Sequence, residues 1–459
     1  MMSFVKAMIA GLSGRKPGLQ SAAMSQRHDP RSRGRAVAAS EEEMVFRFQA
    51  SDNMLGDVGS EKLLRAIKSF APSQPTQNIA QFAGRADILT QVITAIEEHR
   101  NHLVLFGGRG TGKTSLALAM SSVARRAGYH CSYISCTRES TIDSIFRSAL
   151  SELPIRYDHQ FDPRNEEVDP NLSFESLAPQ VEMTPQVLAD LLARIRSTRL
   201  LIVIDEFDRN ENQTLTRGLT EIMKVLSDRA IPVQIVIVGV GDVVDNLVGE
   251  HSSIARVLYV VRLTSMSDQQ IRDTLALASR YAEVEMLPDV TEAIVSISYG
   301  RPYIARLVGL KAAKMSLLRG SPYVEIEDFR SGTEELLGYL DSAGFGQAGR
   351  FIGASATNVS LFVAMLRCRR DSSDRFTVSD VCEVLTNPPA SADCVQRVQQ
   401  AIDLLASPEF GLLTTTPGPV PLSQFVDPRA ELCISILCGR ALGRLPRAQA
   451  SVQAFHPSS

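Results

Sequence analysis

The 459-residue sequence has no run of eighteen or more apolar residues, so no transmembrane helix and no membrane partner are predicted. Lysine is scarce, with eight residues against forty arginines, and this bias runs along the whole chain. The formal net charge is only −3, so any affinity for nucleic acid must come from a local patch. None of the seven cysteines forms a pair with metal-ligand spacing, and we expect buried, reduced thiols in a cytoplasmic protein.

The chain is too long for one compact core, and two or three domains are expected. Residues 1–40 carry seven basic side chains and a single acid, Asp29. This composition fits a disordered tail, an organelle transit peptide, or an over-long start whose true first residue is Met24. We predict a disordered basic tail over 1–45 and a helical lead-in over 46–78.

A glycine-rich stretch stands between an apolar run at 102–106 and a helix-like segment, and it matches G-x-x-x-x-G-K-[ST]. Glycines let the backbone curl so that several N–H groups point at one phosphate chain, and the following helix adds its N-terminal positive charge. Lys113 should reach the β- and γ-phosphates, and Thr114 should hold Mg²⁺. The predicted nucleotide-binding residues of this loop are Gly107, Gly108, Arg109, Gly110, Thr111, Gly112, Lys113, Thr114 and Ser115.

A second apolar run, 201–204, ends in two adjacent acids, Asp205 and Glu206. Ligands bind at the carboxyl ends of strands in open α/β sheets, so both carboxylates should lie near the loop. We expect Asp205 to hold Mg²⁺ and Glu206 to orient the attacking water, because phosphoryl transfer mainly needs positioning and charge stabilisation. The alternative is that the two acids merely mark the solvated start of a helix. The pattern predicts ATP hydrolysis, with Lys113 and Glu206 as catalytic residues.

Apolar strands alternate with helical segments from about residue 100 to 240, which indicates a parallel sheet with helices on both faces. The proline- and acid-rich stretch 154–185 predicts a surface loop, either solvated or used to dock a partner. Beyond residue 267 we predict helices without strands. These helices are expected at 268–282, 288–298, 302–318 and 326–340.

A glycine-rich break at 344–349 precedes a last unit. In this unit three helical segments come before a turn-rich hairpin candidate at 408–426 and a final helix. Three helices followed by a β-hairpin suggest a winged-helix module.

These motifs together resemble the AAA+ ATPases, in particular the branch of initiator and origin-recognition type ATPases and their bacterial relatives. The resemblance covers about residues 79 to 340, and its pieces occur in family order. Residues 81–85, Gln-Phe-Ala-Gly-Arg, look like the box that lies along the adenine, which implies contacts from Phe82 and Arg85. The resemblance implies a P-loop NTPase sheet followed by an all-α lid.

Residues 250–256 resemble the segment that carries the arginine finger. This resemblance implies that Arg256 stabilises transition-state charge at a neighbouring subunit's nucleotide. The alternative is a surface arginine paired with Glu250. At the sensor-1 position the polar candidate is Asp242, where the family usually has Asn, Thr or Ser.

The sensor-2 signature is recognisable at Gly300-Arg301-Pro302, but Tyr303 stands where the family usually has an arginine. Arg301 and Arg306 are the available cations, and spacing does not choose between them. The domains that we predict are a nucleotide-binding core at 79–265, a lid at 266–342, a linker at 343–354, a winged-helix domain at 355–445 and a tail at 446–459.

The resemblance implies an ATP- and Mg²⁺-dependent hydrolase that works as a homo-oligomer or AAA+ hetero-oligomer on DNA or a protein–DNA complex. Yet residues 350–459 hold ten arginines, no lysine and nine acids, which permits DNA binding without favouring it. The alternative is an ATP-dependent signalling or defence switch whose C-terminal module docks a protein partner. A third possibility is a nucleotide-binding module with negligible turnover. The local basic cluster of the C-terminal module, at residues 350–459, consists of Arg367, Arg369, Arg370 and Arg375.

Overall fold

The computed structural model describes most of the chain from residue 58 onward. All described residues belong to the second of the two units into which the chain divides, Leu55–Ser459. Several sequence predictions lie outside the described residues, namely the tails over 1–45 and 446–459, Phe82, Asp242 and Glu250. The described ranges are 58–71, 84–161, 169, 171–210, 212–240, 252–371, 375–386 and 391–443.

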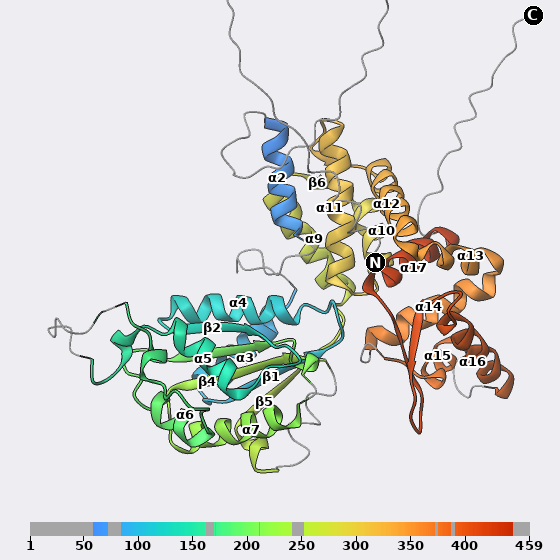
Figure 1. The fold of residues 1–459 in the computed structure, drawn as a ribbon. Coiled ribbons are helices and arrows are strands. Elements are labelled where there is room, and N and C mark those ends of the chain that lie inside the picture. The colour runs from blue at the N-terminus through green and yellow to red at the C-terminus, as the bar shows by residue number, and fades with distance from the viewer. Residues whose placement is uncertain are drawn as a thin grey trace, which may run out of the picture. The chain divides into compact units, whose positions relative to one another are not determined.

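A five-stranded parallel sheet lies at the centre of the nucleotide-binding region, in the order β2-β3-β4-β1-β5 (Figure 1). Because every strand runs the same way, the carboxyl ends of β1 and β3 lie at one edge of the sheet. The strands are β1 (His102–Gly107), β2 (His130–Ser135), β3 (Leu200–Asp205), β4 (Val233–Gly239) and β5 (Leu258–Leu263).

Apolar helix faces cover both sides of this sheet. Along β1, Leu103 and Leu105 belong to one buried cluster and Val104 belongs to the other, as the two-residue period of a strand requires. The first cluster includes α3 (Ala86–Glu97) and α4 (Lys113–Arg126). The second cluster includes α5 (Ile142–Glu152), α6 (Pro185–Leu192) and α7 (Gln213–Asp228). The predicted fold class, a parallel sheet with helices on both faces, is therefore confirmed.

Two features of this region differ from the sequence prediction. Strand β5 was not predicted, although its apolar residues pair with β1 along the full length of that strand. The stretch 154–185 is not simply a surface loop, because Ile155, Phe174 and Met183 are buried in the same cluster as α5. Two 3₁₀ turns, η3 (Ile155–Tyr157) and η4 (Phe174–Leu177), place the first two of these side chains.

The lid is a group of helices whose bounds agree with the sequence prediction. They are α9 (Asp268–Ala282), α10 (Pro288–Ser298), α11 (Pro302–Leu318) and α12 (Ile326–Leu340). Two short strands pair within this region, β6 (Glu285–Met286) and β7 (Tyr323–Val324), so the prediction of helices without strands was wrong in this detail.

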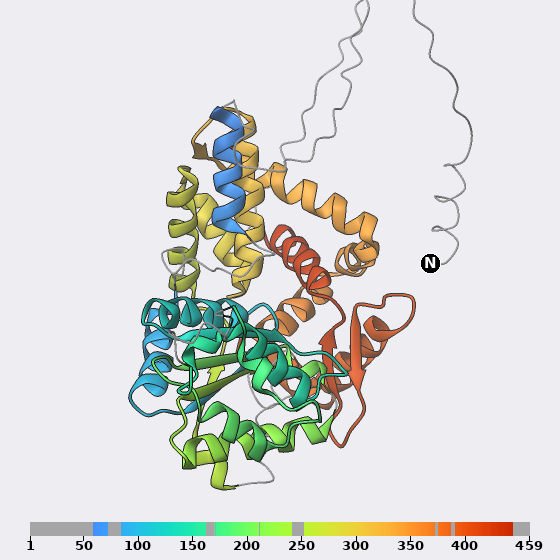
Figure 2. The ribbon, with the colours of Figure 1, turned by 60° about the vertical axis from the view of Figure 1, so that its left-hand side comes forward.

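A helix from before the sheet also joins the lid. Helix α2 (Val58–Phe70) lies alongside α9 and α11 in Figures 1 and 2. Its Ala66 and Phe70 are fully buried in the lid core, and Phe70 lies against Gly309 of α11. The helical lead-in predicted over 46–78 therefore contains one helix in its described part, and that helix packs on the lid.

The predicted linker at 343–354 is helical, with a π turn η7 (Asp341–Phe345) running into α13 (Gln347–Ala354). The last unit shares one buried core with the lid. A bridge between Phe376 and Ser423 places a short extended segment between its first two helices, which gives the helix and strand order of a winged helix. Its elements are α14 (Ala356–Asp371), α15 (Val378–Thr386), α16 (Ala392–Ala406), β8 (Leu413–Thr416), β9 (Leu422–Phe425) and α17 (Pro428–Ala441).

The described helices include none that is both long enough and apolar enough to cross a membrane. The seven cysteines all fall among the described residues, and each is buried and outside any disulfide.

His102, which begins β1, is buried and hydrogen-bonded on both ring nitrogens. Nδ1 accepts from the Ile235 amide at 3.0 Å, and Nε2 lies 3.0 Å from the Met223 carbonyl oxygen, so the ring is the neutral Nε2–H tautomer. Desolvation by burial lowers the pKa of His102 to about 4.

We predict that this histidine makes stability fall in acid. The unfolded chain takes up the proton near pH 6.5, so the contribution of His102 is complete above that value and disappears as pH falls toward 4. The total effect is about 3 kcal/mol. Urea unfolding of the wild type and His102→Gln between pH 4 and 7 measures it. The variant should lose less stability than the wild type on acidification, and equal losses would contradict the assignment.

Candidate nucleotide-binding site

The loop between β1 and α4 takes its shape from glycines at two positions. Gly107 has a φ of +150° and approaches β5 so closely that a Cβ there would lie 2.2 Å from the Leu263 carbonyl oxygen. Gly112 caps α4 with a φ of 93°, in the left-handed region that only glycine adopts easily. Helix α4 therefore starts at Lys113 with its first amides unpaired by the helix itself, which makes the loop a site for anions.

Lys113 folds back into this loop. Its Nζ donates to the carbonyl oxygens of Gly107 and Gly108, both at 2.8 Å. The Thr111 hydroxyl also donates to the Gly108 carbonyl oxygen at 2.8 Å. The ammonium group is thereby held beside the start of α4, where it adds to the positive end of the helix dipole.

Thr114 and Asp205 bring the two sequence motifs into direct contact. The Thr114 hydroxyl donates to Asp205 Oδ2 at 2.7 Å, and the Tyr133 hydroxyl donates to the same oxygen. The Glu206 amide donates to Oδ1 at 2.7 Å. The carboxylate is buried at the carboxyl end of β3. A hydroxyl and a carboxylate at this distance are oxygen ligands of the kind that Mg²⁺ takes beside nucleotide phosphates.

Glu206 lies next to this buried carboxylate but is more open to solvent. Its Oε2 accepts from the Ser135 hydroxyl at 2.8 Å and lies 2.9 Å from Arg209 Nη1. Its side chain is 40% exposed. Its backbone has φ 57° and ψ 34°, a left-handed conformation that is strained for a residue with a Cβ. The two adjacent acids thus have different surroundings, one buried at the loop and one accessible to water.

Arg85 is a buried cation with unmet hydrogen-bonding capacity. Its Nη2 donates to the Thr264 carbonyl oxygen, but its Nε and Nη1 are buried and have no hydrogen-bond partner among the described residues. Burial lowers the pKa of Arg85 to about 10. Unpaired buried donors are unfavourable, so this position fits a ligand rich in acceptor oxygens or nitrogens, as a nucleotide is.

The two sensor-2 candidates occupy different places on α11. Arg301 caps the helix, and its Nη1 donates to the Arg109 carbonyl oxygen in the loop. Arg306 lies further along α11, where burial lowers the pKa of its guanidinium group. Tyr303 stands beside the loop as well, because a Cβ on Gly110 would lie 3.7 Å from the Tyr303 Cβ.

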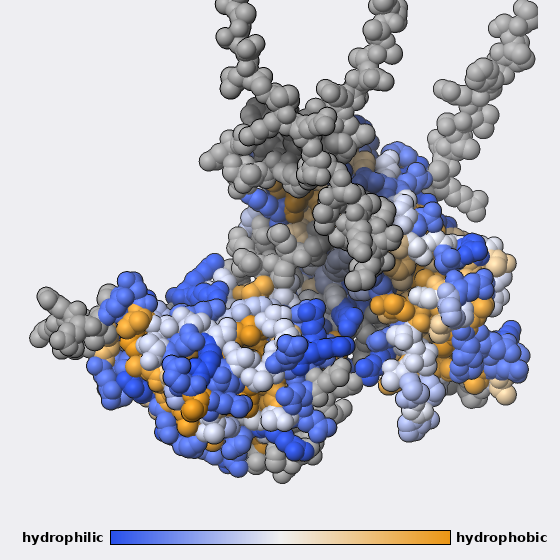
Figure 3. Space-filling view, viewed as in Figure 1, coloured by the Kyte–Doolittle hydropathy of each residue, from blue (hydrophilic) through white to orange (hydrophobic). Residues whose placement is uncertain are grey.

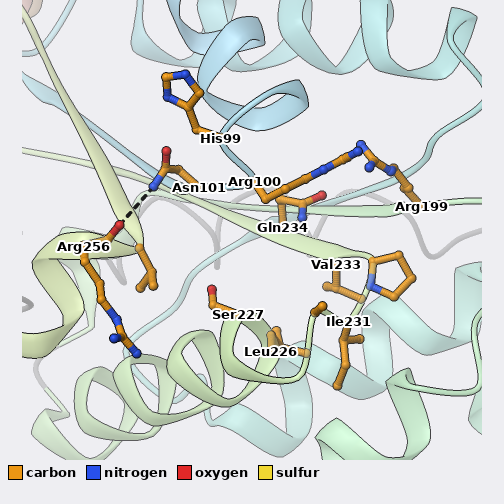
Figure 4. Close-up of a pocket in the computed structure, with 13 residues that line it drawn as sticks. His99, Arg100, Asn101, Arg199, Leu226, Ser227, Ile231, Val233, Gln234 and Arg256 are labelled. Carbon is orange, nitrogen blue, oxygen red and sulfur yellow. Dashed lines mark hydrogen bonds between the residues drawn. The ribbon is translucent and has the colours of Figure 1, made fainter.

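Arg256 lies at the opposite edge of the sheet, where the strands begin. It lines a cavity of about 360 Å³ together with residues such as Asn101 and Gln234 (Figure 4). Its guanidinium is 2.7 Å from Asp228, and its carbonyl oxygen accepts from the Asn101 side chain at 3.4 Å. Strand β1 begins at this edge, and the loop with Lys113 follows its other end. Arg256 is therefore not part of its own chain's phosphate-binding loop.

Three contacts of the site were missed by the sequence analysis. Tyr133 and Ser135 come from β2, whose register sets Ser135 beside Asp205, and Arg209 follows Glu206 by three residues. Alternating polar residues near the end of β2 are a weak signal, because an edge strand often carries them toward solvent. Only the pairing of β2 with β3 reveals their role.

The family comparison agrees with this geometry. Residues 96–247 match the family model of the AAA domain. The chain therefore carries an AAA domain, which is a P-loop nucleotide-binding domain of ATPases, and the predicted AAA+ resemblance is confirmed. A comparison with curated proteins returned no match.

Solved structures that are similar to this chain include Cdc6p, Orc1 and RuvB. Cdc6p from Pyrobaculum aerophilum is 18% identical, with a TM-score of 0.43, and the match covers 82% of this chain and 98% of that one. Orc1 of Aeropyrum pernix, solved in complex with DNA, is 16% identical, with a TM-score of 0.40 and coverage of 82% and 97%. The Thermotoga maritima RuvB Holliday junction branch migration motor is 15% identical, with a TM-score of 0.38 and coverage of 75% and 93%.

The strained backbone at Glu206 yields a stability prediction. Both Glu206→Gly and Glu206→Ala remove the side-chain contacts, but only glycine relieves the left-handed strain. We expect the glycine variant to be more stable than the alanine variant by about 1 kcal/mol. Urea unfolding measures the difference.

Asp208 provides the matched control, since it lies two residues on in the 3₁₀ turn η5 (Phe207–Arg209). There Asp208→Ala should be at least as stable as Asp208→Gly, because no positive φ favours glycine. If the glycine and alanine variants ranked in the same order of stability at both positions, the strain at Glu206 would be contradicted.

Proposed function

We propose that the protein binds and hydrolyses ATP with Mg²⁺, as an oligomer that couples nucleotide state to assembly on or remodelling of DNA or a protein–DNA complex. The observation that carries the catalytic part is the 2.7 Å hydrogen bond between Thr114 and Asp205. It joins the P-loop to the acidic end of β3, which is the arrangement that Mg²⁺-dependent phosphoryl transfer needs.

Each residue of the site has a distinct part in this proposal. Lys113 and the loop amides bind the phosphates, and Thr114 and Asp205 hold the metal. Mg²⁺ would supply charge neutralisation between the phosphate oxygens. Glu206, half-open to solvent, orients the attacking water, and the Ser135 hydroxyl and Arg209 keep its carboxylate in place until substrate binds.

Arg85 and Arg301 supply positive charge from the sides of the site. Arg85 has free donors for the nucleotide, and Arg301 already contacts the P-loop backbone. We assign sensor-2 function to Arg301, whose guanidinium donates to this backbone.

Arg256 acts in a neighbouring subunit in this proposal. It lies at the strand-start edge and is 65% exposed, so it can reach another chain but belongs to a different edge from its own Lys113. Its pairing with Asp228 would be exchanged for the neighbour's phosphates on assembly. Hydrolysis then depends on subunit contact, as for an arginine finger supplied in trans.

A mixing experiment tests hydrolysis and the trans finger together. Lys113→Ala removes phosphate binding but leaves Arg256 intact, and Arg256→Ala does the reverse. We expect each variant alone to lose ATP turnover by about 100-fold or more, since a finger contributes about 10³–10⁵ in rate. An equimolar mixture should regain a measurable part of the wild-type rate of phosphate release.

Arg272→Gln, at a surface pair with Glu292 in the lid, is the control and should keep wild-type turnover. A mixture as inactive as its components would exclude the trans role of Arg256. Normal hydrolysis by Lys113→Ala alone would remove the proposed mechanism.

A specific observation favours the alternative function, a switch whose C-terminal module docks a protein. In a helix-turn-helix the second helix reads DNA, and here that helix is α16. Its charged residues are Asp393, Arg397 and Asp403, with Arg397 paired to Asp393, so the helix has no surplus of positive charge. Val395 and Leu404 are exposed on it, and Figure 3 shows hydrophobic and hydrophilic residues mixed over this domain.

The salt dependence of DNA binding separates the two functions. Glu206→Gln with ATP should hold the assembled form, and its affinity for duplex DNA should fall with a log–log slope of about −0.9 per phosphate contact. Substituting Arg367, Arg369 and Arg370 with glutamine together should flatten the slope by about 2 to 3 units if the basic cluster binds DNA. A slope near zero in the parent would exclude the DNA role and leave protein docking.

A further inference from the structure

A buried arginine of the lid joins the P-loop to the C-terminal domain. The Arg301 side chain is 3% exposed, and its Nε lies 3.4 Å from Oε1 of Glu431 on α17, whose side chain is 6% exposed. The Nη1 of the same guanidinium donates to the Arg109 carbonyl oxygen in the loop. One cation therefore contacts the phosphate-binding loop on one side and a carboxylate of the C-terminal domain on the other.

Burial distinguishes this pair from a more exposed ion pair between the lid and α17. Arg440 and Glu334 also join α17 to α12, but at 3.7 Å and with side chains 35% and 58% exposed. Exposed pairs contribute little, whereas a buried charge that loses its partner is strongly destabilised. The charge of Arg301 must therefore be balanced, and in this structure Glu431 contributes to that balance.

Helix α17 is attached to the lid as well as to the winged helix. It packs against α10 and α12, and the figures show it beside them (Figures 1 and 2). Its buried Leu432 and Ile436 belong to the same core as the lid helices.

From this arrangement we infer that Glu431 is a positioning residue that competes with the terminal phosphate of ATP for Arg301. ATP in the P-loop then weakens the Arg301–Glu431 pair and loosens α17 from the lid, so nucleotide state is transmitted to the C-terminal domain. The inference rests on the proposed binding of ATP at this loop, and it adds a residue from a different domain to the site.

The direction follows from charge. A nucleotide at the loop brings phosphate oxygens to the side of the guanidinium that now faces the Arg109 carbonyl oxygen. One positive charge then has two anions, and strengthening one interaction weakens the other. ATP has one more phosphate than ADP, so it competes more strongly. By reciprocity, removing the carboxylate must favour ATP by the same factor that ATP disfavours the pair.

The test compares nucleotide affinity in the full chain, using fluorescent ATP and ADP analogues with Mg²⁺. Glu431→Gln keeps the shape of the side chain and removes its charge, and it should tighten ATP binding by about fivefold or more. Affinity for ADP should change by less than about twofold, within the range of uncoupled effects. In an Arg301→Ala background, Glu431→Gln should leave ATP affinity unchanged.

Glu334→Gln is the matched control, because it makes the same chemical change in the exposed ion pair between the lid and α17. It should leave both affinities at wild-type values. An equal effect of Glu431→Gln on ATP and ADP, no effect, or an effect that persists without Arg301 would overturn the inference. A wild type that binds no ATP would overturn the proposed function as well, which distinguishes the two failures.

A second measurement needs no change at residue 431, in case Glu431→Gln does not fold. Amide hydrogen exchange of the wild type is followed with a non-hydrolysable ATP analogue and with ADP, both saturating. The backbone amides of α17 that follow Pro428 should exchange faster with the ATP analogue, because α17 is then less tightly held. Equal or slower exchange would contradict the coupling.

Discussion

The contact between the Thr114 hydroxyl and the Asp205 carboxylate is the interaction on which the site depends. These residues are 91 positions apart in the sequence and come from different strand–helix units. They meet because β1 and β3 are parallel and end at the same edge of one sheet, with β4 between them. Every proposed step of phosphate and metal binding needs this edge to be assembled, so the packing of the sheet is a condition for the chemistry.

Buried cations are the second organising feature. Lys113 lies in the loop of the AAA domain, whereas Arg85 precedes α3 and Arg301 precedes α11 in the lid. Both arginines are buried. A buried charge needs a partner, and a nucleotide can supply one. The site therefore has a physical reason to respond to phosphate. When a nucleotide binds, its phosphates can replace the incomplete or internal partners of these guanidinium groups.

Much of this architecture could be predicted from local patterns. The lid helices begin and end where the sequence places them, because Ser267 forms a capping box with Gln270 and prolines open α10 and α11. The loop motif and the acid-ended strand were found because their spacing is local. Strand β5 and the buried Phe174 were missed, since an edge strand and a packed turn show their role only when paired with distant residues.

Residue type and spacing alone indicated a phosphate-binding loop, an acidic strand end, a helical lid and a last unit of helices with a hairpin. Those features follow from residue type and spacing within short windows, where backbone geometry and helix capping act. The folded structure was needed to show that Tyr133 and Ser135 border the acids, that Arg301 contacts the loop, and that Glu431 shares that arginine. Such contacts arise from strand register and helix packing between distant segments, and no local pattern specifies them.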